Sequence, residues 1–302
     1  MDLGLIKSLC KQTPTKLQAS LYKFLKCNSH YKFVKYADEY IIAEGELPIC
    51  LVAHMDTVFS GVPSEFFYDG RKKMLWSPYG SGFDDRAGIY LILKIIEKGF
   101  YPSIIFTQGE EIGGIGAHAL IKDAPECPLL DCRALIQLDR AHKEDAVFYE
   151  CDNKDFEKFI CSYGFKHDWG TFTDISIIAP TWKIAAVNLS VGYVDEHTTS
   201  ERLYCKWTDL TFKRLCKILE DSKDMKSYSY IPHVYNYIKD FNNYYSMFKD
   251  NDIYDFKCLI CDKEFDVGRH VYYEGGSGYD TCEECFKKYH VDNTPNKVIK
   301  KT

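Results

Sequence analysis

The chain has 302 residues, of which 46% are hydrophobic and 15% aromatic, and its formal net charge is −6. This length and composition are typical of one large packed domain with a small appended unit, and they argue against a disordered protein. The modest charge gives no general case for binding nucleic acid or a membrane surface, no apolar run is long enough to span a bilayer, and the first residues lack the apolar core of a signal peptide. We therefore expect a cytoplasmic protein.

The spacing of apolar residues predicts short strands that alternate with helices. In chain order, we expect a helix at 14–27, strands at 32–35, 40–43 and 49–53, a helix at 84–98, a strand at 103–107, a helix at 114–122, strands at 133–138 and 146–149, a helix at 154–163, a strand at 184–190 and a helix at 201–221. This alternation predicts a three-layer α/β/α sandwich with a mixed, largely parallel sheet. In such sheets, ligand-binding groups gather at the carboxyl ends of the strands.

The composition changes after the last of these helices. We assign residues 1–221 to the α/β domain and residues 222–255, which are rich in tyrosine and asparagine, to a packed connector. Residues 256–302 form a separate small unit. Four of the 13 cysteines are clustered in this unit, and the others are scattered through the α/β domain, where we expect reduced thiols because the chain lacks an export signal.

Histidines and acidic residues recur at the ends of predicted strands or in the turns that follow them. His54 and Asp56 follow the strand at 49–53, and alternation places both side chains on one side, where the carboxylate can support the imidazole. The other residues at such positions are Asp84 and Asp85, Glu110 and Glu111, Asp139, and His197. Taken singly, each has an ordinary explanation, such as a histidine satisfied by a local turn or an acid that caps a helix.

Taken together, these residues predict a metal site. Carboxylates about 5 Å apart repel by roughly 3 kcal/mol per pair at an effective dielectric constant near 20, so several of them converging without cations would shift their pKa values or move apart. Divalent ions remove this penalty, and a mixed histidine and carboxylate set suits zinc and related metals. The number of acidic residues exceeds what one ion uses. We therefore expect two ions, as in hydrolases that activate a water between two metals.

Five motifs in sequence order, HMDTV, GFDDRAG, GEEIGGIGA, LDR and DEHTTSE, resemble those of the co-catalytic zinc exopeptidases of the M28, M20 and M42 families. The resemblance covers about residues 30–220. It implies that His54 and Asp139 bind one ion. Glu111 and His197 would bind the second ion, and Asp84 would bridge both.

The resemblance also implies that Glu110 is the general base and that Asp56 supports His54. The segment between Asp139 and His197 is too short for the extra domain that many M20 members insert there, so the chain resembles a bare catalytic domain. The expected activity is that of an aminopeptidase acting on a peptide. The alternatives are a di-zinc carboxypeptidase or dipeptidase, and a deacylase of N-acyl amino acids, because the same metal core serves all of them.

The four clustered cysteines predict a second kind of metal site. Cys258 and Cys261 form one C-x-x-C pair and Cys282 and Cys285 form another, with a separation that is typical of a four-thiolate structural zinc site. Two redox-active pairs are the alternative, but the expected βαβ context is missing. The charge of residues 256–302 is balanced, which does not favour nucleic-acid binding. We expect this zinc ribbon to dock a protein partner or the catalytic domain, and a non-catalytic adaptor that acts through the ribbon is the alternative of another class.

Overall fold

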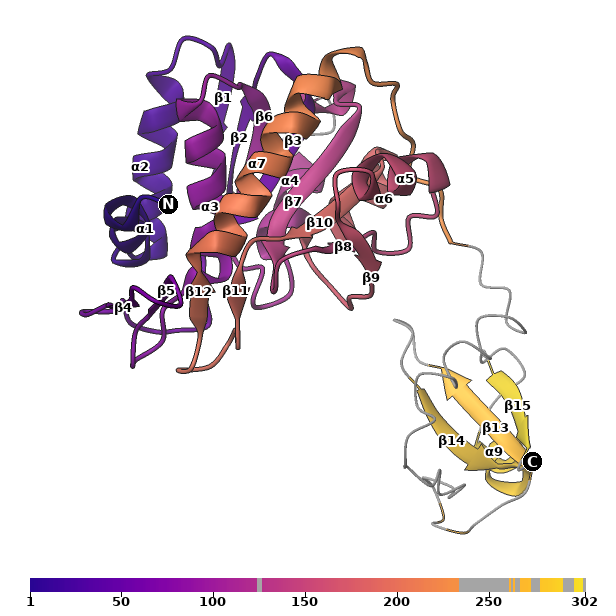
Figure 1. The fold of residues 1–302 in the computed structure, drawn as a ribbon. Coiled ribbons are helices and arrows are strands. Elements are labelled where there is room, and N and C mark those ends of the chain that lie inside the picture. Colours follow the sequence, from indigo (N-terminus) through magenta and orange to yellow (C-terminus); the bar gives the residue numbers. More distant parts are fainter. Residues whose placement is uncertain are drawn as a thin grey trace. The chain divides into compact units, whose positions relative to one another are not determined.

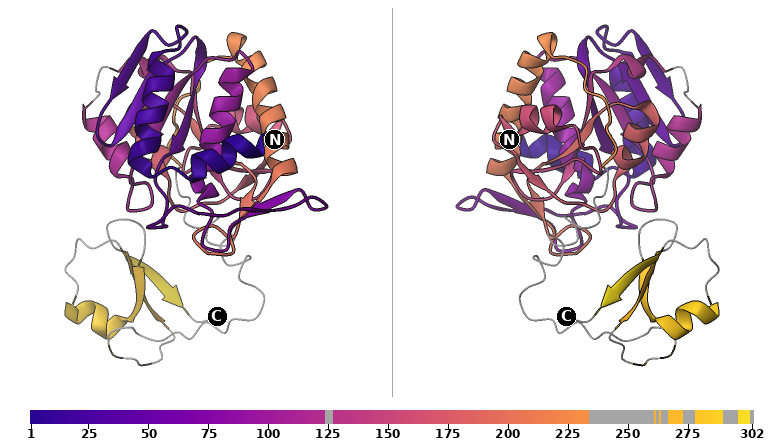
Figure 2. Two further views of the ribbon diagram at one scale, coloured as in Figure 1. Left: turned by 90° about the vertical axis from the view of Figure 1, so that its left-hand side faces the viewer. Right: turned by 90° about the vertical axis from the view of Figure 1, so that its right-hand side faces the viewer.

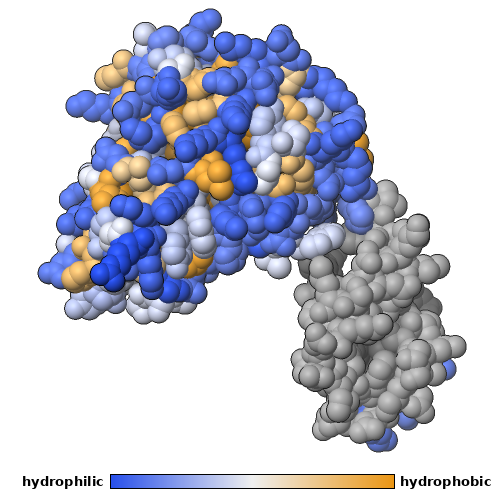
Figure 3. Space-filling model, in the orientation of Figure 1, coloured by the Kyte–Doolittle hydropathy of each residue, from blue (hydrophilic) through white to orange (hydrophobic). Residues whose placement is uncertain are grey.

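The computed structural model describes residues 1–123 and 127–233, and residues 261, 263, 267–272, 278–289 and 296–300 near the C-terminus. The chain divides into two compact units, Met1–His233 and Val234–Thr302 (Figure 1). Among the described residues, no helix is both long and apolar enough to cross a membrane. The surface of the first unit that faces the viewer in Figure 3 is largely hydrophilic, with small hydrophobic areas between the charged side chains.

An eight-stranded sheet forms the centre of the first unit. Its strands, in spatial order, are β1 (Phe33–Tyr36), β2 (Tyr40–Glu44), β6 (Pro102–Thr107), β3 (Leu47–His54), β7 (Ala134–Arg140), β10 (Ala186–Ser190), β8 (Asp145–Val147) and β9 (Lys166–Asp168). The four central strands, β6, β3, β7 and β10, are parallel, whereas β2 and β8 run antiparallel to their central neighbours. Because the central strands share one direction, their carboxyl ends meet at one edge of the sheet.

Helices cover both faces of this sheet (Figures 1 and 2). One face packs against α1 (Leu3–Cys10), α2 (Pro14–Lys26), α3 (Phe83–Glu97), α5 (Lys154–Cys161) and α7 (Cys205–Asp221). The other face packs against α4 (Ile115–Asp123), the short 3-10 helix η1 (Pro128–Asp131) and α6 (Asp174–Trp182). Successive residues of β3 alternate between the two cores, since Leu51 faces the first and Val52 the second. The predicted three-layer sandwich with a mixed, largely parallel sheet is confirmed.

A second, four-stranded sheet was not predicted. It contains β11 (Tyr193–Val194), β12 (Arg202–Tyr204), β5 (Met74–Trp76) and β4 (Phe67–Asp69), in this order. We expected the last helix to begin at residue 201, but α7 begins at Cys205 because residues 202–204 pair with β5. This sheet connects the segment before α3 with the segment before α7.

The beginning of the expected connector packs on the first unit. Met225 and Tyr228 are buried in its core, and the backbone N–H of Ala185 donates to the carbonyl of Tyr228 at 2.8 Å. These contacts follow a short 3-10 helix, η2 (Ser222–Asp224). Residues 234–255 lie outside the described residues.

The second unit contains a three-stranded antiparallel sheet in the order β14 (Gly278–Cys282), β13 (Val267–Tyr272) and β15 (Asn296–Lys300). A short helix, α9 (Glu283–Tyr289), follows β14 directly. This junction brings Cys282, the last residue of β14, close to Cys285 in the first turn of the helix.

Candidate active site

The predicted site residues of the first unit lie on neighbouring segments at the carboxyl edge of the large sheet. His54 ends β3, and Asp139 lies near the end of β7, its parallel neighbour. Glu110 and Glu111 follow β6, which pairs with β3 on its other side. Asp56 follows β3, Asp84 lies at the start of α3, and His197 lies in the loop between β11 and β12.

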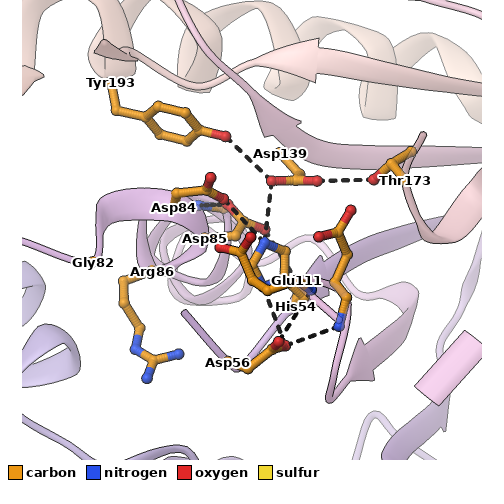
Figure 4. A network of polar contacts seen from close by, with 12 residues as sticks. His54, Asp56, Gly82, Asp84, Asp85, Arg86, Glu111, Asp139, Thr173 and Tyr193 are labelled. Atoms are coloured by element: carbon orange, nitrogen blue, oxygen red, sulfur yellow. Dashed lines mark hydrogen bonds and ion pairs between the residues drawn. The ribbon is translucent and has the colours of Figure 1, made fainter. Parts of the chain in front are cut away.

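Asp84 lies between the two histidines. Its Oδ1 atom is 3.0 Å from Nε2 of His54, and its Oδ2 atom is 3.0 Å from Nε2 of His197. The residue is only 6% exposed, so its carboxylate faces these partners rather than bulk solvent. Figure 4 shows the side chain pointing into the cluster from the start of α3. Each oxygen of one carboxylate therefore serves a different histidine.

Asp139 and Glu111 each lie close to one of the two histidines. Nε2 of His54 is 3.4 Å from Oδ1 of Asp139, and Nε2 of His197 is 3.0 Å from Oε2 of Glu111. Ligand atoms about 2.1 Å from a tetrahedral zinc ion lie roughly 3.4 Å from one another. The observed separations are close to this value. His54, Asp84 and Glu111 also offer ligand atoms that all lie within 4.8 Å of one another.

The electrostatics of the cluster also suit a cation. Burial raises the pKa of Glu111 to about 7, with the charge of Asp84 acting in the same direction. Burial likewise raises the pKa of Asp139 to about 6, despite the nearby His54. Oε1 of Glu111 is buried and has no hydrogen-bond partner among the described residues. A divalent ion among these donors would satisfy this oxygen and relieve the repulsion between the carboxylates.

The histidines respond to the same negative charge. The hydrogen bond with Asp84 raises the pKa of His197 to about 9. Burial disfavours a proton on His54, but the charge of Asp139 and hydrogen bonds with the surrounding carboxylates raise its pKa well above the usual range. For Asp84 the two histidines outweigh burial and lower the pKa. The donor set therefore attracts positive charge strongly, and its mixed nitrogen and oxygen atoms fit zinc.

Asp56 contacts two parts of the site. Its Oδ1 and Oδ2 atoms accept the backbone N–H groups of Glu110 and Glu111, each at 3.2 Å. Its Oδ1 atom is also 3.3 Å from Nδ1 of His54, at ion-pair distance but outside hydrogen-bond geometry. The support of His54 was expected from the sequence, whereas the anchoring of the Glu110–Glu111 backbone was not. Asp56 therefore holds the backbone of these two glutamates close to the His54 side chain.

Several residues that hold Asp139 were missed in the sequence. The hydroxyl of Tyr193 donates to Oδ1 of Asp139 at 3.2 Å, and the hydroxyl of Thr173 donates to Oδ2 at 2.9 Å (Figure 4). The amide of Gln137 donates to the same Oδ2 atom at 3.1 Å. Only the Gln137 contact had a local signal, because alternation places Gln137 and Asp139 on one side of β7. The other two side chains come from segments far away in the sequence, since Tyr193 lies in β11 and Thr173 directly precedes α6.

Two more acids lie close to the site. Asp174 is buried at the start of α6, and one of its oxygens accepts the hydroxyl of Thr107. Glu201 is also buried, and its carboxylate accepts the backbone N–H groups of Gly82 at 2.7 Å and Asp84 at 2.9 Å. Neither acid approaches the two histidines at ion-pair distance among the contacts of the described residues.

Three of the four clustered cysteines lie together in the second unit. Sγ of Cys261 is 3.9 Å from Sγ of Cys282, and the sulfur atoms of Cys261, Cys282 and Cys285 all lie within 4.8 Å of one another. Sulfur ligands about 2.3 Å from a tetrahedral zinc ion lie roughly 3.8 Å apart, so this spacing fits such a site. Cys258 lies outside the described residues.

No protein-family model matches this sequence, and no curated protein matches it significantly. Solved structures do resemble the structure. A tripeptidase from Staphylococcus aureus is 16% identical, with a TM-score of 0.60 over 74% of this chain and 98% of its own. Aminopeptidase PepT from Bacillus cereus is 15% identical, with a TM-score of 0.57 over 72% and 96% of the two chains. A glutaminyl cyclase from Tannerella forsythia is 13% identical, with a TM-score of 0.53 over 73% and 97%. The chain thus shares its fold with these enzymes, most of which are peptidases.

Proposed function

We propose that the first unit, Met1–His233, is the catalytic domain of a two-zinc aminopeptidase. The observation that carries this proposal is the position of Asp84 between two groups of possible metal ligands: each of its two carboxylate oxygens faces a different histidine. The fold is consistent with it, since solved neighbours include a tripeptidase and an aminopeptidase. We assign His54 and Asp139 to one ion, Glu111 and His197 to the other, and Asp84 to both.

Bound ions would lower the pKa of a water molecule and polarise the carbonyl of the scissile bond. Glu110 then has the role of general base: its carboxylate accepts the proton of the attacking water and delivers it to the amine that leaves. Burial, with a further contribution from the charge of Asp139, raises the pKa of Glu110 to about 9. This value applies to the metal-free site, where the carboxyl group holds its proton at neutral pH; bound cations would lower the pKa toward the range in which the carboxylate can accept a proton.

The Asp56 carboxylate keeps Glu110 and Glu111 in different roles. Because Asp56 accepts both backbone N–H groups, the two successive side chains leave a fixed backbone in different directions. Glu111 approaches His197, within reach of the second ion. We assign Glu110 to the substrate side. Two neighbouring acids thus act as a ligand and as a base.

The test is hydrolysis of a panel of aminoacyl, N-acyl and carboxy-terminal amide substrates, with the metal content measured alongside. Release of a free N-terminal residue would support the aminopeptidase. Preference for the other two substrate types would identify a carboxypeptidase, a dipeptidase or a deacylase of N-acyl amino acids. A metal-loaded protein that cleaves no amide would refute the catalytic proposal and favour an adaptor.

The Glu110→Gln variant tests the base. It should lose turnover while about two metal equivalents remain in the first unit, because Glu110 is not a ligand in this assignment. Glu97→Gln, on the exposed end of α3, is the matched control and should keep full activity. Wild-type activity of Glu110→Gln would contradict the assignment.

We further propose that the second unit binds one structural zinc through Cys258, Cys261, Cys282 and Cys285 and docks a protein partner. The spacing of the three described sulfur atoms supports the site. The cytoplasmic location remains a proposal from the sequence. Metal analysis of variants at these cysteines tests the zinc assignment.

A further inference from the structure

Glu201 connects two loops of the candidate active site that are far apart in the sequence. It lies four residues after His197 and is 0% exposed. Its Oε2 atom accepts the backbone N–H of Gly82 at 2.7 Å, and its Oε1 atom accepts that of Asp84 at 2.9 Å. Its backbone carbonyl accepts the hydroxyl of Ser81 at 3.2 Å. One residue therefore contacts nearly every position of the segment that ends in Asp84.

The segment before α3 needs such an external partner. Gly82 has a left-handed backbone with φ of 65°, and Asp84 and Asp85 have non-helical backbone angles although they lie at the start of α3. Backbone N–H groups at the start of a helix have no acceptor within the helix. A carboxylate at this position satisfies them and is favoured by the helix dipole. Glu201 supplies both of its oxygens for this purpose.

We propose that Glu201 is a positioning residue that fixes the Asp84 backbone so that each Asp84 oxygen faces one histidine. This inference rests on the proposed two-metal function. Because Asp84 contacts both His54 and His197, a shift of its backbone disturbs both halves of the donor set at once. The loss of Glu201 should therefore weaken the binding of both ions rather than of one.

Asp56 has the same arrangement on the other side of the site. It follows His54 by two residues and accepts the N–H groups of Glu110 and Glu111. Asp56, near His54, thus anchors the backbone of Glu111. Glu201, near His197, anchors the backbone of Asp84 in the same way. The recurrence of this arrangement supports a role for Glu201 in the geometry of the ions, beyond a general role in packing.

The experiment compares zinc binding by the full-length Glu201→Gln variant and the wild type, using competition with a chromophoric chelator. Glutamine has the same shape but only one acceptor oxygen, so its NH2 group would face one of the two N–H donors. We expect zinc affinity in the first unit to fall by about 10–100-fold, as is usual when a residue behind a metal ligand is lost. The cysteine site contributes equally to both proteins.

The matched control is Ile218→Ala, in the buried core on α7 and remote from the donor set. It should lower the denaturant midpoint without a change in zinc affinity. If Glu201→Gln also lowers the midpoint and leaves zinc affinity unchanged, the positioning proposal is overturned while the proposed function stands. If the wild type binds no zinc in its first unit, the proposed function itself fails.

A second variant covers the case in which Glu201→Gln does not fold. Ser81→Ala removes the hydroxyl that donates to the Glu201 carbonyl and accepts the backbone N–H of Ser77, but it leaves both hydrogen bonds of the Glu201 carboxylate in place. We expect a smaller loss of zinc affinity, of a few fold, in the same direction. Unchanged affinity in this variant would also count against the proposal.

Discussion

Gly88 allows α3 to lie against β7, and its replacement by alanine should disturb the fold and the site together. A Cβ atom at Gly88 would lie 2.0 Å from the carbonyl oxygen of Leu138 and 2.5 Å from Oδ1 of Asp85. Ordinary contacts of this kind are 3.4–4 Å. The helix and the strand must therefore separate by roughly 1 Å or more, since a backbone carbonyl in a central strand cannot rotate away.

The energy follows from two opposing effects. Overpacking of a core costs about 1–3 kcal/mol, and we expect the upper end because backbone atoms clash. Alanine has the better helix propensity and returns about 1 kcal/mol. Gly88→Ala should thus lower the free energy of unfolding by about 2 kcal/mol. Because Asp84 lies in the first turn of α3 and Asp139 follows Leu138, zinc affinity should fall as well.

Denaturant unfolding of the chelated protein, followed by circular dichroism, measures the first effect, and chelator competition measures the second. Gly70→Ala is the control, because a Cβ atom at Gly70 meets nothing within 4 Å. This control should be neutral or slightly stabilising. If Gly88→Ala unfolds at the same denaturant concentration as Gly70→Ala, the close packing of α3 on β7 is not what the structure indicates.

Two more predictions concern pH and the second unit. The pKa values of Glu110 and His197 are both raised to about 9, from ordinary values of 4.5 and 6.5, so the folded, chelated protein holds protons that the unfolded chain releases. Its free energy of unfolding should therefore fall as the pH rises from about 5 to 9, and bound zinc should remove most of this fall. Thermal unfolding at pH 6 and pH 9, with and without zinc, measures both effects. Equal stability of the chelated protein at the two pH values would contradict the prediction. Replacement of Cys261 and Cys282 by serine should remove one zinc equivalent by metal analysis and leave the hydrolysis of small substrates unchanged, whereas a loss of activity would show that the second unit contributes to catalysis.

The central strands of the fold could be predicted because their sequences are locally distinctive. The run before His54 is apolar at every position, as expected for a strand buried on both faces. The strand β12 was not predicted: its three residues pair with the two-residue strand β11 on one side and with β5, far away in the chain, on the other, and so short a strand leaves little pattern in the sequence. The helix α6 was missed because it contains Pro180, and a proline usually ends a helix.

The candidate site shows the same contrast. Residues at strand ends could be located in the sequence because parallel strands place their carboxyl ends together. The contacts of Tyr193 and Thr173 with Asp139 could not be predicted, because a single hydroxyl that reaches a carboxylate across the fold leaves no local pattern. Glu201 lies within a motif that we quoted, yet its role depends on backbone N–H groups, which every residue except proline carries.

Glu201 and His197 come late in the chain, and this position decides when the candidate site can be completed during synthesis. A ribosome releases β3, α3, β6 and β7 well before the loop that holds His197 and Glu201. Until that loop emerges, Asp84 lacks both its second histidine and its backbone anchor. A growing chain that ends before this loop can form most of the large sheet, but it lacks part of the donor set. Under the proposed two-metal assignment, the full set of ligands is therefore available only after this loop has joined the sheet.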